Sequence, residues 1–194
     1  MSESRFIKSD LKYSPLTPNL WNDFEILFGE RGACGGCWCM LWRLKRSEFE
    51  SGKGEGNRNA MRAIVESGVE PGILAYLRRK PIAWCSVAPR EDYPALERSR
   101  IMKKIDETPV WSISCFFIDK GYRNQGVSTC MVRATIDYVK RRGGNTLEAY
   151  PVEPKKKHTP PAFAWTGLAS AFKKVGFIEC ARRSETRPIM RYYI

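Results

Sequence analysis

A short segment around Gly126 has the residue types of a phosphate-binding turn. The stretch Arg123-Asn124-Gln125-Gly126-Val127-Ser128 joins an apolar run before it to an amphipathic run after it. The first turn of a helix has backbone N–H groups without intrahelical partners and a partial positive charge, and glycine lets an anion approach closely. The pattern predicts an anion site at Gly126; the alternative is a glycine that serves only helix packing.

Two strands and one helix must position this turn. Residues 110–118 form the strongest predicted strand, residues 125–142 the strongest predicted helix, and residues 146–150 a short second strand. The apolar stripe of the helix recurs at helical spacing: Val127, Cys130, Met131, Ala134 and Tyr138. A strand, helix, strand crossover makes the two strands parallel neighbours.

These residues resemble the fingerprint of the GNAT superfamily of acetyl-CoA-dependent N-acetyltransferases. Its Gln/Arg-x-x-Gly-x-Gly/Ala pattern is matched by Arg123 and Gly126, with Ser128 in the last position. The stretch 172–177 is similar to the family's helix-to-strand segment ending in Gly-Phe, and the order of elements agrees over nearly the whole chain. The Cys-Gly-Gly-Cys-Trp-Cys stretch, residues 34–39, resembles that of a GNAT subfamily of unassigned substrate.

The resemblance implies acetyl-CoA as the co-substrate and places its binding residues. Backbone amides would hold the pyrophosphate at Gln125, Gly126, Val127, Ser128 and Thr129. Phe116 and Ile118 would offer main-chain groups to the acetyl carbonyl and the pantetheine, where the sheet splays. Arg123, Arg133 and Lys173 are candidates to screen the phosphates, and solvated surface charge is the alternative for each.

The residues that would accept the amine proton depart from the family pattern. Many relatives have a glutamate base on the strand before the turn, where this chain has Ser112. Glu148 and Tyr150 share one face of the neighbouring strand by its two-residue period. Either is a candidate base, directly or through water. The alternative is that both are ordinary strand residues.

The family's usual acid is also missing. Its tyrosine corresponds to Phe172 here, and the asparagine seven residues before that tyrosine corresponds to Trp165. Ser170 is the nearest candidate acid, although helical spacing turns it away from the face of Phe172. The resemblance therefore predicts a cofactor-binding helix with altered contacts.

The cysteine-rich stretch 34–39 raises the question of zinc, because paired thiolates at this spacing suit tetrahedral coordination. A fourth ligand is lacking, since His158 is the sole histidine and Cys85, Cys115 and Cys130 have the surroundings of core residues. We expect no metal. The stretch forms either a tight turn beside an acceptor pocket lined by Trp38 and Trp42, or a packed loop without substrate contact.

Length and charge bound the class of protein. The 194 residues suit one domain, 1–194, and no apolar run approaches the roughly 20 residues of a membrane span. Residues 1–11 have no apolar segment typical of a signal peptide, and seven cysteines suggest reduced thiols, so we expect no secretion and a cytoplasmic protein away from membranes. The net charge of +12 attracts polyanions. The basic run 155–158 lacks interleaved aromatic residues, which argues against a nucleic-acid partner.

The remaining pattern completes the predicted fold. It predicts two early helices, a hairpin, a charged insertion with one short helix, a late helix and two last strands. Their ranges are 17–28, 59–67, 73–77 with 82–88, 93–105, 167–175, 177–181 and 189–192, and residues 52–57 form an exposed loop. The fold class is α/β, with a mixed, mostly antiparallel central sheet of about seven strands, a splayed parallel pair and helices on both faces.

The leading hypothesis is an N-acetyltransferase that moves acetyl from acetyl-CoA to a primary amine by direct attack. The acceptor, a small molecule or a peptide, is not defined by the sequence, and a homodimer is left open. One alternative is a basic nucleic-acid or ribosome-associated binding protein that retains the fold. Another is a redox or metal sensor built on the cysteine cluster.

Overall fold

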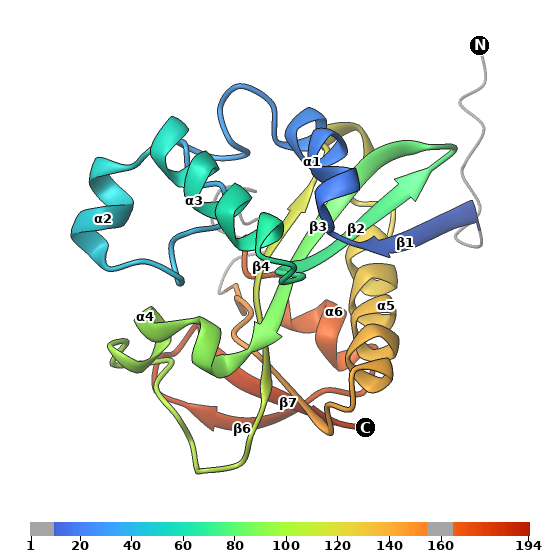
Figure 1. Ribbon diagram of the computed structural model, residues 1–194. Coiled ribbons are helices and arrows are strands. Elements are labelled where there is room, and N and C mark those ends of the chain that lie inside the picture. Colours follow the sequence, from blue (N-terminus) through green and yellow to red (C-terminus); the bar gives the residue numbers. More distant parts are fainter. Residues whose placement is uncertain (1–9, 155–164) are drawn as a thin grey trace.

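Seven strands form one mixed sheet. The computed structural model describes residues 10–154 and 165–194 (Figure 1). The strand order is β1-β2-β3-β4-β5-β7-β6, and among these pairs β4 and β5 alone are parallel. The strands are β1 (Leu11–Pro15), β2 (Gly72–Leu77), β3 (Lys80–Pro89), β4 (Trp111–Ile118), β5 (Thr146–Ala149), β6 (Ile178–Arg182) and β7 (Pro188–Tyr193). The predicted fold class is confirmed.

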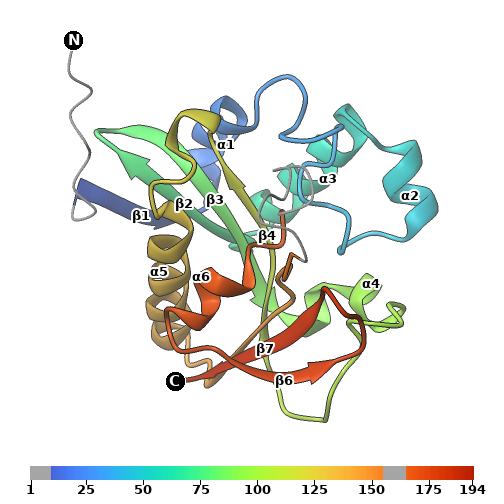
Figure 2. The same cartoon turned by 180° about the vertical axis from the view of Figure 1, so that it is seen from behind.

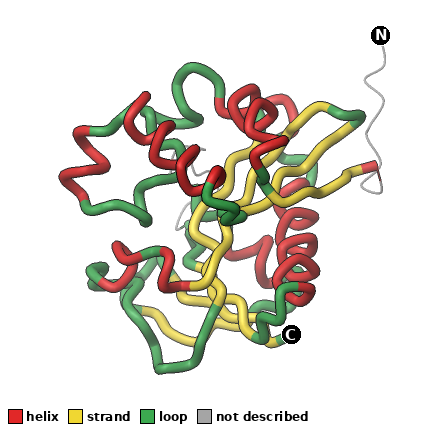
Figure 3. The backbone as a smooth tube through the Cα atoms, in the orientation of Figure 1, coloured by secondary structure: helices red, strands yellow, loops and turns green. Residues whose placement is uncertain are grey.

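Helices cover both faces of the sheet. The α-helices are α1 (Trp21–Phe28), α2 (Arg46–Ser51), α3 (Glu55–Glu66), α4 (Pro94–Glu97), α5 (Val127–Arg141) and α6 (Ala169–Lys173). Short 3₁₀ helices are η2 (Pro18–Leu20), η3 (Arg90–Asp92) and η4 (Lys120–Tyr122). Figure 1 shows α1 and α3 on one side of the strands, and Figure 2 shows α5 and α6 on the other. Figure 3 shows the strands passing between these two layers.

Helix α5 packs as its sequence pattern predicts. Val127, Met131 and Tyr138 recur at helical spacing and are buried with Val87 and Ile113 of the sheet. Burying an apolar stripe of this kind stabilises a helix more than its intrinsic propensity does. This packing fixes the start of α5 at the end of β4. Within the described ranges, no helix is long and apolar enough to cross a membrane.

An aromatic core fills the opposite face. Trp21, Phe28, Trp38 and Trp84 are all buried there, and the Trp38 and Phe28 rings stack 5.6 Å apart. Trp38 is therefore a packed core residue, which favours the second alternative for this stretch, a packed loop. Its large apolar ring gains more from burial against α1 than it would at a wet pocket.

The segment after the cysteine stretch also differs from the prediction. Residues 52–57 are not an exposed loop, because α3 begins at Glu55 and Asn57 is fully buried. The Asn57 amide donates to the carbonyl oxygens of Gly36, at 3.0 Å, and Phe49, at 3.2 Å. The polar composition of residues 52–57 predicts exposure to solvent, whereas the Asn57 side chain supplies hydrogen bonds to backbone carbonyls in the interior.

Three further elements differ from the prediction. Strand β1 and helix α2 were not predicted, because each is short and has a weak apolar pattern. The predicted helix over 93–105 is reduced to α4, Pro94–Glu97. A third buried cluster lies under α4 and includes Tyr93, Leu96, Tyr150 and Ile189. This cluster anchors one of the candidate catalytic residues.

Candidate active site

The parallel strands β4 and β5 separate after a few residues. Their pairing covers Trp111–Ile113 and Leu147–Ala149. Immediately beyond it, β4 has a bulge at Ser114, since Val87 faces Ile113 while Ser86 faces Cys115. Bulges increase the local twist of a strand and are common beside active sites. The splay predicted beside Phe116 and Ile118 is present.

The chain before α6 occupies part of the opened edge of β4. The Phe116 backbone N–H donates to the carbonyl oxygen of Trp165 at 2.6 Å. Two residues along, the carbonyl oxygen of Ile118 accepts a 2.9 Å hydrogen bond from Nε of Arg123. Phe116 and Ile118 therefore both direct backbone groups to the edge that β5 leaves uncovered.

The N-terminus of α5 stands open at the end of this edge. Gly126 is its N-cap, with φ +82°, a conformation that favours glycine. No side chain caps the helix, and its first turn contains no acidic residue. Ser128 and Thr129 are half-buried beside the buried Val127. The first-turn N–H groups and the helix dipole together make a site for an anion.

The turn before α5 is stabilised by its own side chains. Arg123 is tied to the end of β4, and the exposed Gln125 donates to the carbonyl oxygen of Gly121 at 2.9 Å. Asn124 has φ +60°. Sequence reasoning placed Arg123, Gln125 and the first turn of α5 together, and the structure brings them to one corner of the fold.

Helix α6 buries Phe172 and exposes Ser170. Phe172 is fully buried, with its ring 5.8 Å from that of Phe116 and 5.0 Å from that of Phe177. Ser170 lies on the exposed side of the helix. Lys173 bonds to the Glu153 carboxylate at 2.6 Å, which commits its charge to a protein partner. Arg133 is exposed on α5, and residues 155–158 lie outside the described ranges.

Glu148 and Tyr150 meet in a buried polar network. The Tyr150 hydroxyl donates to Oε1 of Glu148 at 2.7 Å and lies 2.9 Å from Oγ of Ser112. Arg90 donates to the same Glu148 oxygen, and Nε of Arg191 donates to Oε2, both at 2.9 Å. The Glu148 side chain is 1% exposed. Buried carboxylates need partners of this kind, because isolated ionised groups are costly to bury.

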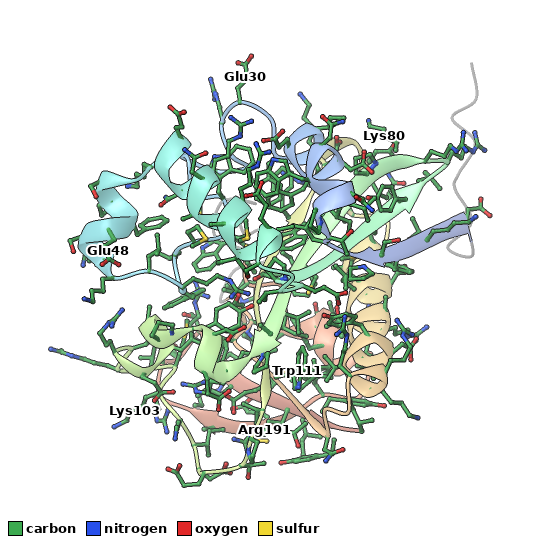
Figure 4. All side chains as sticks on the ribbon, viewed as in Figure 1. Glu30, Glu48, Lys80, Lys103, Trp111 and Arg191 are labelled. Atoms are coloured by element: carbon green, nitrogen blue, oxygen red, sulfur yellow. The ribbon has the colours of Figure 1, made fainter. Side chains whose placement is uncertain are left out.

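The network defines which protonation states are available. Burial, assisted by the Glu148 carboxylate, raises the pKa of Tyr150 well above its ordinary value of 10. The hydroxyl is therefore a phenol at neutral pH. Hydrogen bonds from Arg191 hold the pKa of Asp106 well below its usual range. Arg191, labelled in Figure 4, connects this outer carboxylate to Glu148.

Two hollows lie near this network. A cavity of about 170 Å³ is bordered by Glu148, Arg191 and Asp106. A groove of about 410 Å³ is lined by Leu41, Trp42, Leu44, Arg46, Glu50, Ala95, Arg98 and Ser99. At the groove, Trp42 stacks on Trp165 with ring centroids 5.9 Å apart. The volume of this groove, about 410 Å³, is in the range of small-molecule sites.

A thiol cluster in the aromatic core contains Cys37, Cys39 and Cys115. The Cys39 and Cys115 sulfurs are 3.3 Å apart, and Trp84 donates to the Cys39 sulfur at 3.1 Å. Burial raises the pKa of Cys37 to about 12, so its thiol stays protonated at neutral pH. No group of three possible metal ligands occurs among residues 10–154 and 165–194.

Several site residues carry no recognisable sequence signal. Arg90 and Arg191 reach Glu148 from positions 58 and 43 residues away. For Arg191, the one clue in the sequence is that it interrupts the otherwise apolar run 189–192. Arg187 and Thr166, hydrogen-bonded at 2.7 Å, were also missed, because each lies in an irregular segment.

The geometry is that of an acyl-CoA-dependent N-acyltransferase: a splayed parallel pair and an uncapped helix at the end of the inner strand. The chain belongs to the Acetyltransferase (GNAT) family, whose sequence pattern matches residues 38–164. Acetyl-CoA is accordingly its co-substrate, and the open N-terminus of α5 fits the phosphates of that molecule. A comparison with curated proteins found no similar sequence.

Solved structures share the fold at low sequence identity. The PaiA N-acetyltransferase of Thermoplasma acidophilum, in complex with coenzyme A, is 12% identical with a TM-score of 0.53, covering 95% of this chain and 99% of its own. The ribosomal-protein-S5-alanine acetyltransferase of Vibrio fischeri is 13% identical with a TM-score of 0.56, covering 98% and 97%. A GNAT-family acetyltransferase of Streptococcus agalactiae is 13% identical with a TM-score of 0.56, covering 95% of both chains.

Proposed function

We propose that this protein transfers acetyl from acetyl-CoA to a primary amine by direct attack, without a covalent enzyme intermediate. The observation that carries the proposal is the uncapped N-terminus of α5 at the end of the splayed strand β4. It places an anion site beside a strand edge that β5 leaves uncovered. A small-molecule amine and a peptide N-terminus are both compatible acceptors, and the Vibrio fischeri neighbour is named for a protein alanine acceptor.

In this proposal the backbone of the turn holds the pyrophosphate. The N–H groups from Gln125 to Thr129 supply the donors, and Gly126 keeps the approach free of a side chain. Arg123 is a positioning residue, because it ties the turn to Ile118. Lys173 contributes little, since Glu153 already neutralises it.

The edge of β4 holds the acetyl end. Phe116 is proposed to offer its N–H to the thioester oxygen, where a backbone donor stabilises the charge that develops during attack. Because that N–H donates to Trp165, segment 165–166 must shift when the acetyl group binds. Ile118 lies two residues along on the same edge and is proposed to contact the pantetheine.

Tyr150 and Glu148 are proposed to take the amine proton together. The hydroxyl already donates to the Glu148 carboxylate, so it can pass its proton inward while accepting one from a water that contacts the amine. Arg90 and Arg191 hold the Glu148 carboxylate in place. Direct contact with the amine is disfavoured for both residues, because Glu148 and Tyr150 are each 1% exposed.

Ser170 remains a proposed proton donor to the departing thiolate. Its exposed position on α6 means that it would act at the solvent side of the cofactor. A thiol with a pKa near 8.5 is a tolerable leaving group, which reduces the demand for any acid. Phe172 has no proton to give and is fully buried.

Other expectations stand beside this proposal. The single domain 1–194 is supported by the one continuous sheet. A cytoplasmic location and a homodimer stay predictions. The nucleic-acid or ribosome-associated alternative, motivated by the net charge of +12, gains no support from the family or from the three structures described above.

The test combines binding with turnover. Calorimetry with acetyl-CoA should give saturable binding, and release of CoA thiol should depend on an added amine from a panel of polyamines, amino acids, aminoglycosides and peptides. Binding to RNA or DNA that weakens steeply with salt, without acetyl-CoA binding, would instead favour the nucleic-acid alternative.

A further inference from the structure

Arg187 differs from the other arginines buried in this face of the sheet. Arg43, Arg90 and Arg191 each reach a carboxylate, at Asp92, Glu148 and Asp106 among others. Arg187 is half-buried, and no acidic side chain pairs with it within the parts of the chain that are described. Its contacts are the Thr166 hydroxyl, at 2.7 Å, and the ring of Trp165, 5.8 Å from its guanidinium carbon.

The environment of Arg187 favours an anion. Burial removes water from the guanidinium and lowers its pKa from 12.5, without a carboxylate to offset the cost. A guanidinium has five N–H donors, and the Thr166 bond uses one of them. The nearby Glu153 carboxylate is already bound by Lys173 and Arg182. A charge left without a partner in this way is expected to receive one from a ligand.

The position of Arg187 relates it to the acetyl end of the site. Its partner Trp165 has its carbonyl oxygen bound to the Phe116 N–H. Trp165 also stacks on Trp42, and Trp42 packs against the buried cluster that contains Tyr150. Phe172, in contrast, belongs to the core of α5. Arg187 therefore lies on the face of the sheet that holds the proposed base, opposite α5.

Trp42, which stacks on Trp165, has an unpaired donor of its own. Nε1 of Trp42 is buried without a hydrogen-bond partner, and Trp42 lines the 410 Å³ groove. The groove has apolar Leu41 and Leu44 together with Arg46 and Arg98 against one carboxylate, Glu50. Its lining thus has an excess of positive charge around an aromatic wall.

We propose that Arg187 binds a carboxylate of the acceptor, so that the substrate is an amine that also contains a carboxyl group, such as an amino acid. Arginine recognises carboxylates by two parallel hydrogen bonds, which fixes orientation as well as affinity. The Trp42–Trp165 pair then packs against an apolar or aromatic part of the same molecule. This inference rests on the proposed acetyl transfer and specifies its acceptor.

The experiment compares matched acceptors. Phenylalanine and phenylalaninamide, with leucine and leucinamide, differ in the carboxylate alone; rates are corrected for the fraction of free amine at the assay pH. We expect the wild type to prefer the carboxylate by tenfold or more in kcat/KM. Arg187→Gln should remove this preference through KM of the carboxylates, with the amides changed less than twofold, and Arg187→Glu should reverse it.

The control is Arg183→Gln, an exposed arginine in the same β6–β7 connection that contacts the carbonyl oxygens of Lys103 and Lys104. It should keep the wild-type preference. If Arg187→Gln lowers kcat/KM equally for carboxylates and amides, Arg187 has a structural role and the inference is overturned. It is also overturned if the wild type acetylates the amides alone, or neither kind of acceptor. Absence of acetyl-CoA binding in calorimetry would be a failure of the proposed function itself.

Discussion

The backbone N–H of Phe116 donates to the carbonyl oxygen of Trp165 at 2.6 Å, where β4 has parted from β5. The strand N–H that is proposed to bind the acetyl oxygen is thus paired with the residue whose ring Arg187 contacts. In this proposal, binding of the acetyl group displaces the segment that contains Trp165. This coupling links the acetyl end of the cofactor to the proposed acceptor site.

Tryptophan fluorescence tests this displacement. Acetyl-CoA is expected to change the emission of the wild type, because Trp165 leaves its stack with Trp42 when segment 165–166 shifts. Most of the change should disappear in Trp165→Phe. The control is Trp21→Phe in the α1 core, which should keep the signal. An undiminished signal in Trp165→Phe would show that the segment does not move.

Gly126→Asp should weaken acetyl-CoA binding by roughly tenfold or more. A side chain at φ +82° is strained, and its negative charge would occupy the anion site at the start of α5. Calorimetry measures the dissociation constant. Gly143→Asp is the matched control, because Gly143 has a similar φ of +77° and open space around it, at the far end of α5. An unchanged constant in folded Gly126→Asp would remove the main support for the proposed function.

Phe172→Tyr should lower stability without raising turnover. A new hydroxyl among Phe116, Phe177 and Gly167 would be buried without an evident partner, at a cost of about 1–3 kcal/mol. Urea unfolding and CoA thiol release at saturating acetyl-CoA measure the two effects. A large gain in rate would contradict this expectation and show that the natural enzyme lacks an acid that tyrosine can supply.

The strongest periodic patterns predicted the two elements that carry the proposed cofactor site. The stripe through Val127, Met131 and Tyr138 gave α5 within two residues at each end, and the apolar run 110–118 gave β4. These signals are local, because each residue's burial follows from its neighbours in sequence. The glycine at 126 could be located for the same reason.

The acceptor half could not be predicted in this way. Glu148 was chosen from strand period alone, but its two arginine partners come from η3 and β7. Trp165 departs from the family pattern, and nothing local in the sequence shows that its carbonyl oxygen accepts from the Phe116 N–H. Such contacts depend on how loops close over the sheet, and loop paths have no periodicity to reveal them.

Asp106→Asn should lower stability in a pH-dependent way. Arg191 holds the pKa of Asp106 below its unfolded value of about 3.8, so the native state favours the ionised carboxylate. The stabilisation is present above the unfolded pKa and is lost as the pH falls through the lower folded pKa. Urea unfolding should separate wild type and variant at pH 6, with the gap closing below about pH 4. A gap at pH 2 as large as the gap at pH 6 would contradict this linkage.

Tyr150→Phe should reduce turnover while the protein stays folded. Removing the hydroxyl breaks its hydrogen bonds with Glu148, Ser112 and Arg90, at a cost of about 1–3 kcal/mol, but leaves both arginines paired with the carboxylate. A relay that depends on this hydroxyl should lose about 10²-fold or more in kcat. Thiol release at saturating acetyl-CoA measures it. Glu148→Gln should lose activity as well as about 3 kcal/mol of stability, because two buried arginines lose their shared carboxylate.

The matched control is Tyr93→Phe, a second buried tyrosine in the same cluster, whose hydroxyl contacts Ser86 and Arg43 instead. It should lose comparable stability and keep its turnover. Because the pKa of Tyr150 lies well above 10, titration of its hydroxyl should not shape the pH profile of kcat near neutral pH. Wild type and Tyr93→Phe should therefore show the same pH profile. Full turnover at neutral pH in both Tyr150→Phe and Glu148→Gln would show that neither residue accepts the amine proton, and that the network serves the fold alone.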